Sequence, residues 1–228
     1  MQTECWYWLN SGRCASAFNM ALDEALLEAM PRLCRPVLRF YGWEEPAASF
    51  GYFQKYAEVE KATPLRPLIR RPTGGGIVPH DHDWTYSAIF PPSHEWYFLR
   101  ATASYSRIHE WILGAFRQLS IQVALAPTAL KLAPGQCFAG CEKSDVMWNG
   151  RKIAGAAQRR RTDGLLIQGS VQPPFTGLER SRWEQAMSHI GQGQGIRWLT
   201  FTPGEELQCR AESLAREKYS RTDYNRRR

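Results

Sequence analysis

The stretch Arg70-Arg71-Pro72-Thr73-Gly74-Gly75-Gly76-Ile77-Val78-Pro79-His80-Asp81 places three consecutive glycines after a pair of arginines. Three glycines in a row cost conformational entropy on folding, so they need a physical reason. One reason is a tight turn. Another is a ligand that lies against bare backbone, whose N–H groups could stabilise an oxyanion while the arginines donate beside it. The stretch lacks the ending of a P-loop, and the turn and the ligand site stay equally open.

A second motif, Gly150-Arg151-Lys152-Ile153-Ala154-Gly155-Ala156-Ala157-Gln158, begins inside the dipeptide Asn149-Gly150. Asn-Gly suits a two-residue hairpin turn, because both residues can adopt positive φ. A lysine on the strand after such a turn is usually a solvated surface residue. The small residues at 154–157 instead leave space above the strand for a ligand. A lysine that points into this space would be partly desolvated and could donate to a carbonyl or hold an anion.

The third feature is the segment Pro134-Gly135-Gln136-Cys137-Phe138-Ala139-Gly140-Cys141, which carries two thiols. Buried cysteine usually serves as a small apolar side chain. A cysteine in a glycine-flanked loop near a lysine is a better candidate nucleophile, because a nearby cation favours the thiolate. The six cysteines are irregularly spaced, which favours neither a disulfide framework nor a zinc site.

Composition and charge limit the class of protein. The chain has 228 residues, of which 43% are hydrophobic and 22% charged, and its formal net charge is +7. These values are typical of a globular chain with a sizeable core. We find no membrane-spanning run and no signal-peptide pattern, so we expect a cytoplasmic protein that does not bind membranes. The basic charge suits an acidic protein partner, and the absence of a recognised motif argues against nucleic acid.

Hydrophobic periodicity predicts interleaved strands and helices. Strands are expected at residues 6–8, 37–41, 47–52, 68–71, 85–90, 122–125, 145–148, 152–159 and 164–171. Helices are expected at 17–30, with Ser16 as N-cap and Pro31 as the end, and at 99–119, 181–189 and 203–219. This alternation favours an α+β fold with a mixed β-sheet packed against helices. Nothing marks a domain boundary, so residues 1–228 are interpreted as a single domain.

Two arginine clusters stand out from the rest of the chain. Arg159-Arg160-Arg161 follows the lysine motif closely, so we expect it at the mouth of any site built there. Arg226-Arg227-Arg228 ends the chain, and we expect it to be a frayed tail.

Together these motifs resemble the lipoate attachment superfamily, which shares its fold with biotin protein ligases. The segment Asn19-Met20-Ala21-Leu22-Asp23-Glu24-Ala25-Leu26 is similar to the family's first helix. Residues 70–81 resemble its RRxxGGGxVxHD signature, and residues 150–157 resemble its lysine motif. Lys218-Tyr219 with Tyr224-Asn225 is similar to the closing KY…WN pattern, with Tyr224 in place of the tryptophan. The resemblance covers about residues 5–227 and implies the biotin/lipoate protein ligase catalytic-domain fold.

The superfamily contains two chemistries. Lipoate–protein ligases activate a free acid with ATP, whereas octanoyltransferases take octanoate that is already held as a thioester on acyl carrier protein. Cys137-Phe138 lies fifteen positions before Lys152 and resembles the segment that carries the catalytic cysteine in octanoyltransferases of the Gram-positive type. The resemblance therefore implies Cys137 and Lys152 as catalytic residues, with Cys141 as a competing nucleophile. The chain ends soon after the closing pattern, which leaves no room for the accessory domain of many ligases.

On this resemblance the expected activity is transfer of an octanoyl group from acyl carrier protein, through a cysteine thioester, to a lysine of a lipoyl domain or of glycine-cleavage H protein. Lys152 would sustain the thiolate and orient the acyl carbonyl. No cofactor or metal is expected. The alternatives are a lipoate–protein ligase that uses ATP and Mg, a lipoyl or octanoyl amidotransferase, and a non-catalytic carrier-binding protein. The expected substrate-binding residues are Arg70, Arg71, Thr73, Gly74, Gly75, Gly76, His80, Gly155, Ala156 and Ala157.

Overall fold

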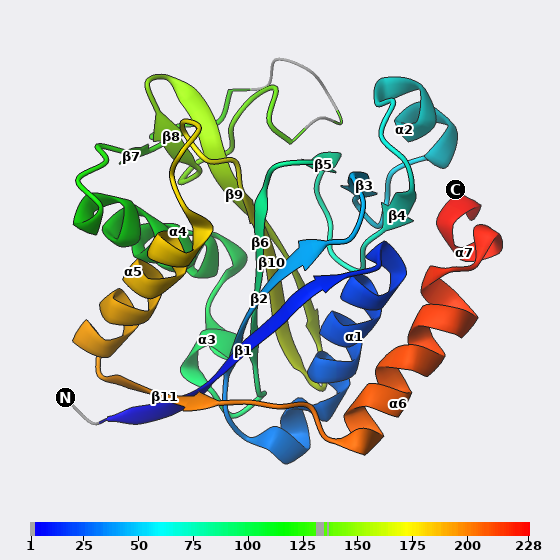
Figure 1. Cartoon of the computed structure of the whole chain (residues 1–228), viewed down its shortest axis with the longest axis horizontal. Coiled ribbons are helices and arrows are strands. Elements are labelled where there is room, and N and C mark those ends of the chain that lie inside the picture. The colour runs from blue at the N-terminus through cyan, green and yellow to red at the C-terminus, as the bar shows by residue number, and fades with distance from the viewer. Residues whose placement is uncertain (1–2, 131–134, 136) are drawn as a thin grey trace.

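The computed structural model describes residues 3–130, 135 and 137–228, and its main element is an eight-stranded sheet (Figure 1). The strands of this sheet are β1 (Glu4–Cys14), β2 (Val37–Trp43), β6 (Trp84–Phe90), β7 (Ala124–Leu125), β8 (Val146–Trp148), β9 (Arg151–Arg161), β10 (Gly164–Val171) and β11 (Ile196–Thr200). Their spatial order is β11-β1-β2-β6-β10-β9-β8-β7. The pairs within β11, β1 and β2 are parallel, and the other neighbouring pairs are antiparallel, so the sheet is mixed as predicted.

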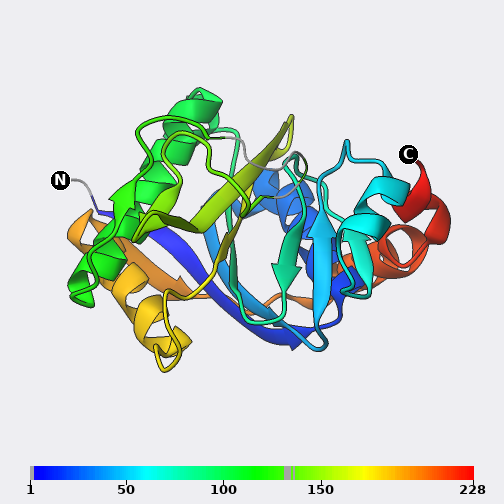
Figure 2. The same cartoon turned by 90° about the horizontal axis from the view of Figure 1, so that it is seen from above.

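Three short strands form a second sheet, which stands beside the curved large sheet when the molecule is seen from above (Figure 2). They are β4 (Leu68–Arg70), β3 (Ala47–Phe50) and β5 (Val78–His80), in that spatial order. The central strand β3 runs parallel to β4 and antiparallel to β5. The glycine motif connects β4 to β5, so the small sheet fixes both ends of that motif.

Helices cover both faces of the large sheet (Figures 1 and 2). On one face α1 (Ser16–Leu33) packs against α6 (Glu205–Leu214), and on the other α4 (Ala101–Gln118) packs against α5 (Arg180–Gly193). The remaining helical segments are α2 (Tyr56–Ala62), α3 (Glu95–Phe98), the π-helical turn η1 (Ala215–Tyr219) and α7 (Thr222–Arg226). The predicted α+β class is confirmed. None of the described helices is both long enough and apolar enough to cross a bilayer.

The apolar core is divided between the two faces of the large sheet. Trp111 of α4 and Trp183 of α5 are almost completely buried on one face, and Leu26 of α1 on the other. All seven residues of β6 and all eight of β10 are buried, which is expected for strands covered on both faces. Polar residues within these strands, such as Gln168 and Ser170, therefore lie inside the protein and require hydrogen-bond partners.

The predicted boundaries of the first helix are wrong at both ends. The helix starts at Ser16, and Ala15 occupies the N-cap position without a side-chain hydrogen bond, so Ser16 does not cap it. Pro31 lies inside the helix, which continues to Leu33. Proline removes only one backbone donor, and that loss so close to the C-terminus leaves the last turn intact. The helix then closes at Cys34, whose left-handed backbone directs its N–H to the carbonyl oxygen of Met30 at 3.0 Å.

The prediction of a frayed C-terminal tail is also wrong. Residues Thr222–Arg226 form α7, and the backbone carbonyl of Arg228 accepts a hydrogen bond from Tyr56 N–H at 2.8 Å. The Arg227 guanidinium lies 3.9 Å from the centre of the Tyr52 ring. Stacking on aromatic faces holds these arginines against the protein, a contact that the sequence of the tail alone does not reveal.

Candidate active site

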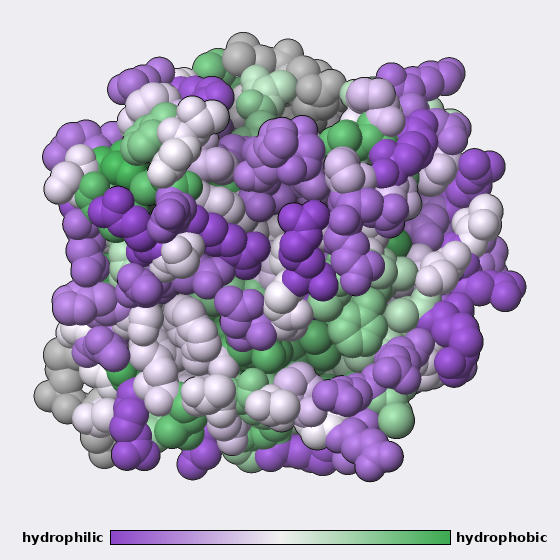
Figure 3. Space-filling model, in the orientation of Figure 1, coloured by the Kyte–Doolittle hydropathy of each residue, from purple (hydrophilic) through white to green (hydrophobic). Residues whose placement is uncertain are grey.

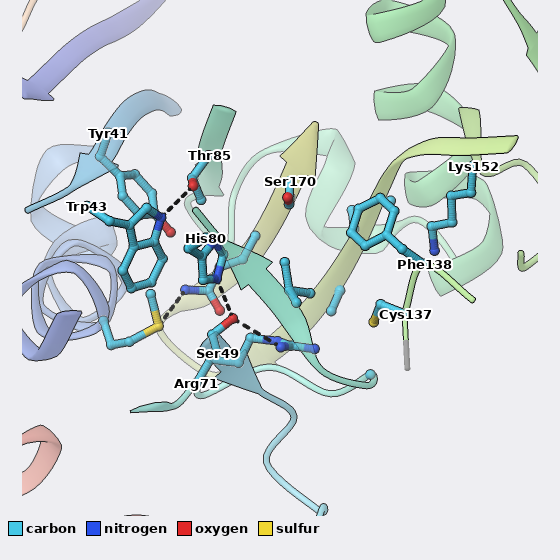
Figure 4. A pocket seen from close by; sticks show the side chains of 18 residues that line it. Tyr41, Trp43, Ser49, Arg71, His80, Thr85, Cys137, Phe138, Lys152 and Ser170 are labelled. Atoms are coloured by element: carbon cyan, nitrogen blue, oxygen red, sulfur yellow. Dashed lines mark hydrogen bonds between the residues drawn. The ribbon is translucent and has the colours of Figure 1, made fainter. Parts of the chain in front are cut away.

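A narrow cavity of about 60 Å³, open to solvent, lies between β9 and β10 of the large sheet and β3 and β5 of the small sheet (Figure 4). Cys137, Phe138 and Lys152 lie toward one end of the cavity, and Tyr41 and Trp43 toward the other (Figure 4). The lining residues are Met20, Tyr41, Trp43, Ser49, Arg71, Gly75, Val78, His80, Thr85, Cys137, Phe138, Lys152, Gly155, Ala156, Ala157, Gln168, Gly169 and Ser170.

The lysine motif forms the predicted hairpin. Asn149 and Gly150 both have positive φ, of 47° and 76°, and connect β8 to β9. Lys152 then projects toward the cavity, where its Nζ lies 2.7 Å from Asp145 Oδ2. Both side chains are buried, with exposed fractions of 8% and 4%. The lysine is therefore a desolvated cation with a fixed counter-charge.

Gly155 is required for this placement of the lysine. A Cβ atom at position 155 would lie 2.6 Å from Lys152 Cε and 2.7 Å from Lys152 Nζ. It would also lie 3.2 Å from Asp145 Oδ1. The glycine thus leaves the space through which the lysine side chain folds back to reach its partner.

Asp145 is a site residue that the sequence analysis missed. A regular register in a two-residue hairpin would place it opposite Ala154. The structure has an irregularity between Val146 and Met147, so that Val146 pairs with Ala154 and Asp145 moves one position further along β9. The backbone N–H of Glu142 also donates to Asp145 Oδ2, at 2.6 Å. An acidic residue just before the hairpin was the available signal, but the register shift that brings it to the lysine was not visible.

Cys137 is held by the glycine motif. Its Sγ accepts a hydrogen bond from Gly76 N–H at 3.1 Å. Ile77 N–H donates to the Gly135 carbonyl at 2.7 Å, and Cys137 N–H donates to the Ile77 carbonyl at 3.1 Å. A Cβ at position 76 would lie 2.5 Å from the Gly135 oxygen, so only glycine admits the cysteine loop at this distance. The glycine motif is a turn, and the same turn holds the candidate nucleophile.

Arg71 provides a second cation at the cysteine. Its Nη2 donates to the carbonyls of Gly74 and Gly76 at 2.6 and 2.8 Å, and its Nη1 donates to Ser49 Oγ at 3.2 Å. Burial lowers the pKa of Arg71, whereas the charge and a hydrogen bond of Cys137 act to raise it. The guanidinium therefore interacts favourably with negative charge on the sulfur, a role that the sequence analysis assigned to Lys152 alone.

The inner end of the cavity is closed by polar residues that form hydrogen bonds with one another. The His80 ring stacks on Trp43, with centroids 3.8 Å apart and planes inclined by 18°. Its two nitrogens lie 2.8 Å from Asp83 Oδ2 and from Ser49 Oγ. The indole N–H of Trp43 donates to Thr85 Oγ1 at 2.7 Å. With these donors and acceptors engaged, the wall offers mainly ring faces and carbon atoms, which suit an apolar ligand.

The structure brings eight of the predicted site residues to the cavity: Arg71, Gly75, His80, Cys137, Lys152, Gly155, Ala156 and Ala157. Gly74 and Gly76 lie at its outer opening, which Gly75, Cys137 and Lys152 also line. Two predicted residues are not brought to the cavity. The Arg70 guanidinium donates to the carbonyls of Tyr52, Gln54 and Asn225. The Thr73 hydroxyl donates to Gln168 Oε1 at 2.7 Å.

The second thiol of the segment, Cys141, is not among the residues that line the cavity. Its Sγ donates weakly to the Thr128 carbonyl at 3.7 Å, and its backbone pairs with Leu130. It lines only the outer opening. Pro134 and Gln136 of the same segment lie outside the described residues. All six cysteines are free thiols, and within the described parts of the chain no group of side chains could hold a metal ion.

Only one arginine of the cluster 159–161 lies beside the glycine motif. Arg159 Nη1 donates to the Pro72 carbonyl at 3.2 Å. Arg160 donates to the carbonyls of Tyr97 and Leu99, and Arg161 Nη1 lies 3.2 Å from Glu24 Oε1. None of the three arginines is among the residues that line the cavity or its outer opening, so of the expected cluster only Arg159 contacts the glycine motif.

The sequence matches the family model described as "Lipoyl protein ligase A/B catalytic domain" over residues 15–173, a range that contains every residue lining the cavity. Octanoyltransferase LipM of Geobacillus kaustophilus is 38% identical over 187 residues, which are 75% of this chain and 66% of that protein. Octanoyltransferase LipM of Bacillus subtilis is 37% identical over 184 residues, with the same coverage of 75% and 66%. The chain thus spans slightly less than two thirds of the length of these relatives.

Solved structures share the fold along almost the whole chain. A lipoate-protein ligase A bound with ATP superposes with a TM-score of 0.78 at 21% identity, covering 99% of both chains. A bi-partite lipoate protein ligase from Thermoplasma acidophilum superposes with a TM-score of 0.74 at 20% identity, covering 98% of this chain and 96% of that one. On the match over residues 15–173 and the shared fold, the chain belongs to the lipoyl protein ligase A/B catalytic domain family.

Proposed function

We propose that the protein is an octanoyltransferase of protein lipoylation. It takes an octanoyl group from acyl carrier protein onto Cys137 and passes it to the lysine of a lipoyl domain or of glycine-cleavage H protein. The observation that carries this proposal is the position of Cys137 Sγ at the end of an apolar cavity, held by Gly76 N–H and beside Arg71. The relatives named octanoyltransferase LipM support the same activity.

The acyl chain occupies the cavity, with its carbonyl near the thiol and its methyl end toward Trp43. The lining suits such a chain, because the polar atoms of the inner wall bond to one another. Burial of each methylene contributes about 0.8 kcal/mol. An unbranched chain is therefore held without specific polar contacts along its length.

The first step transfers the acyl group to the enzyme. The Cys137 thiolate attacks the thioester carbonyl and an S–C bond forms. The sulfur of the carrier departs as a thiolate with the electron pair of its own S–C bond and takes up a proton from solvent. Arg71 and the N–H of Gly76 stabilise the thiolate before the attack. Lys152 uses one N–H on Asp145 and has others to offer the carbonyl oxygen as negative charge develops there.

The second step forms the amide. The neutral amine of the acceptor lysine attacks the Cys137 thioester, a C–N bond forms, and the cysteine leaves as a thiolate while the nitrogen loses a proton to solvent. A thioester is already activated, so neither step requires ATP or a metal. We therefore propose that the reaction needs no cofactor, in contrast to a ligase that must form an acyl-adenylate.

The test is a search for the acyl-enzyme. The protein is incubated with octanoyl-carrier protein in the absence of ATP, and intact mass is measured before and after hydroxylamine, which cleaves thioesters. Wild type and Cys141→Ala should gain one octanoyl group that hydroxylamine removes, and Cys137→Ala should gain none.

Three results would contradict this assignment. Thioester-linked octanoate on Cys137→Ala would exclude Cys137 as the nucleophile. Loss of the adduct in Cys141→Ala alone would exchange the roles of the two cysteines. Modification of a lipoyl domain only when ATP and free acid are both supplied would select the ligase activity.

A further inference from the structure

Three arginines surround a pair of aromatic side chains next to the small sheet. The guanidiniums of Arg227 and Arg159 lie 3.9 and 4.8 Å from the centre of the Tyr52 ring. The guanidinium of Arg228 lies 5.3 Å from the centre of the Phe53 ring, and Phe53 is 70% exposed. On the face that Figure 3 displays, hydrophilic residues with some apolar ones among them cover the region of α2 and α7. We refer to these five residues as the arginine–aromatic patch.

The positive charge of the patch is not neutralised by carboxylates. In the described residues, no side-chain carboxylate oxygen lies within 4.0 Å of the Arg159, Arg227 or Arg228 guanidiniums, whereas Arg226 next to them pairs with Glu60 at 3.6 Å. This positive charge also acts on the buried side chain of Arg70. Burial lowers the pKa of Arg70, and the charges of Arg227 and Arg228 lower it further. The patch is therefore a concentration of uncompensated positive charge.

The patch adjoins the opening that leads to Cys137. Gln54, which follows the two aromatic residues directly, donates from Nε2 to the Gly135 carbonyl at 3.0 Å in the cysteine loop. Gln54 and Cys137 line the same outer opening. Arg159 is joined to the glycine motif through the Pro72 carbonyl. A molecule that contacts the patch is thus next to the entrance to the cavity.

The geometry of the patch suits a phosphate or carboxylate partner. A guanidinium stacked on an aromatic ring is already ordered and keeps its in-plane N–H donors available for an anion. Acyl carriers hold their thioester on an arm that contains a phosphodiester, and this anion is absent from the lysine side chain of an acceptor protein. The donor therefore presents a charge that must pass this opening, in addition to any acidic residues on its surface.

We propose that the arginine–aromatic patch docks the acidic carrier protein that delivers the acyl thioester, with Arg227 and Arg159 contacting the phosphodiester of its arm. The proposal rests on the proposed function, since it assumes a carrier-borne donor. Docking on the unpaired arginines speeds the association of the carrier with the enzyme and lowers the KM for the carrier. It leaves the chemical step at Cys137 unchanged.

The experiment compares two donors and two variants. Acylation is measured with octanoyl-carrier protein and with the octanoyl thioester of N-acetylcysteamine, which has neither phosphate nor protein. Arg227→Gln removes a charge from the patch, and Arg182→Gln removes one from the exposed surface of α5, which packs against α4 and β11. Arg227→Gln should lower kcat/KM for the carrier by roughly tenfold, mainly by raising KM. The dependence of this kcat/KM on salt concentration should become weaker. The small thioester should react equally with all three proteins, and Arg182→Gln should match wild type.

The outcomes separate this proposal from the proposed function. An equal loss with both donors, or no loss with the carrier, would overturn it. An effect confined to the KM of the acceptor protein would also overturn it, because the patch would then dock the acceptor. Binding of fluorescent octanoyl-carrier protein, followed by anisotropy, gives an answer even if Cys137 is not acylated. Weaker binding to Arg227→Gln than to Arg182→Gln supports the docking surface, and equal binding rejects it.

Discussion

At the scale of single residues, the missing side chain of Gly155 decides where the cation of Lys152 lies. The lysine side chain occupies the space that a Cβ at position 155 would need, and Asp145 holds its end there. Both side chains of the ion pair are shielded from water. Removing either partner would therefore leave a buried, unpaired charge and lower the free energy of unfolding. Gly155 therefore provides the space for the lysine side chain and Asp145 provides its counter-charge, and substitutions can separate these two contributions.

We predict different consequences for Gly155→Ala and Asp145→Asn. The added methyl group displaces the ammonium without removing its partner, so the rate of Cys137 acylation should fall by roughly a hundredfold with little loss of stability. Asp145→Asn leaves a buried ammonium without a counter-charge and should lower the free energy of unfolding by about 3–5 kcal/mol. Single-turnover acylation and urea unfolding measure the two effects. Equal destabilisation by both variants would show that Gly155 serves packing only.

At the scale of elements, the glycine motif and the cysteine loop behave as one unit although they are sixty-one residues apart. Backbone hydrogen bonds join Ile77 to Gly135 and to Cys137. The three glycines contribute differently to this unit. A Cβ at Gly74 would meet nothing within 4 Å, whereas one at Gly76 would collide with the Gly135 carbonyl.

This difference predicts that Gly76→Ala and Gly74→Ala diverge. Gly76→Ala pushes the cysteine loop away from the turn and removes the hydrogen bond to Sγ, so the alkylation rate of Cys137 by iodoacetamide should change several-fold. Gly74→Ala should leave that rate and the melting temperature as in wild type. Alkylation is followed by mass spectrometry in a background where the other exposed cysteines are replaced. Identical rates in both variants would contradict a specific role for Gly76 in holding the nucleophile.

The sequence predicted the elements with strong local signals. The Asn149-Gly150 hairpin and β10 were found because turn chemistry and the apolar residues 165–167 are encoded within a few positions. The short elements β5, β11 and α7 were missed, since their formation depends on partners far away in the chain. Strand β5, for example, pairs only with β3, and α7 is held by contacts to β4 and α2.

At the scale of the whole molecule, one buried histidine makes stability depend on pH. Burial, only partly opposed by Asp145, lowers the pKa of His109 to about 4 from its usual 6.5. Its Nδ1 lies 2.7 Å from the Ser144 carbonyl. Between pH 6.5 and 4 the unfolded chain binds a proton at this histidine that the folded protein does not. The folded state should therefore lose roughly 3 kcal/mol as pH falls through this window.

The prediction is tested by urea unfolding of wild type and His109→Gln between pH 7 and pH 4. Wild type should lose stability below pH 6.5, and the variant should lose less. Glu24 provides an internal comparison. Burial raises its pKa, but Lys218 and other partners outweigh burial and lower it, so its contribution is lost only below about pH 4.5. Parallel curves for the two proteins down to pH 4.5 would show that His109 is not the cause.

The site was predictable to the extent that its residues lie in contiguous motifs. Lys152 and the small residues after it carry their own chemical signal, whereas the choice of Cys137 over Cys141 came from the family resemblance. Asp145 reaches Lys152 only because of a strand irregularity, which the sequence does not show. Arg71 comes close to the thiol only through the folding of the glycine turn. The patch formed by the chain end and Tyr52 depends on tertiary packing, which sequence spacing does not report.

The hydrogen bonds between Ile77 and the cysteine loop have a consequence for how such proteins can diverge. Because the loop is anchored to the turn at Gly135 and Cys137, substitutions elsewhere around the entrance can occur without moving the sulfur. Changes in what the entrance admits can therefore arise while the position of the thiol is inherited intact.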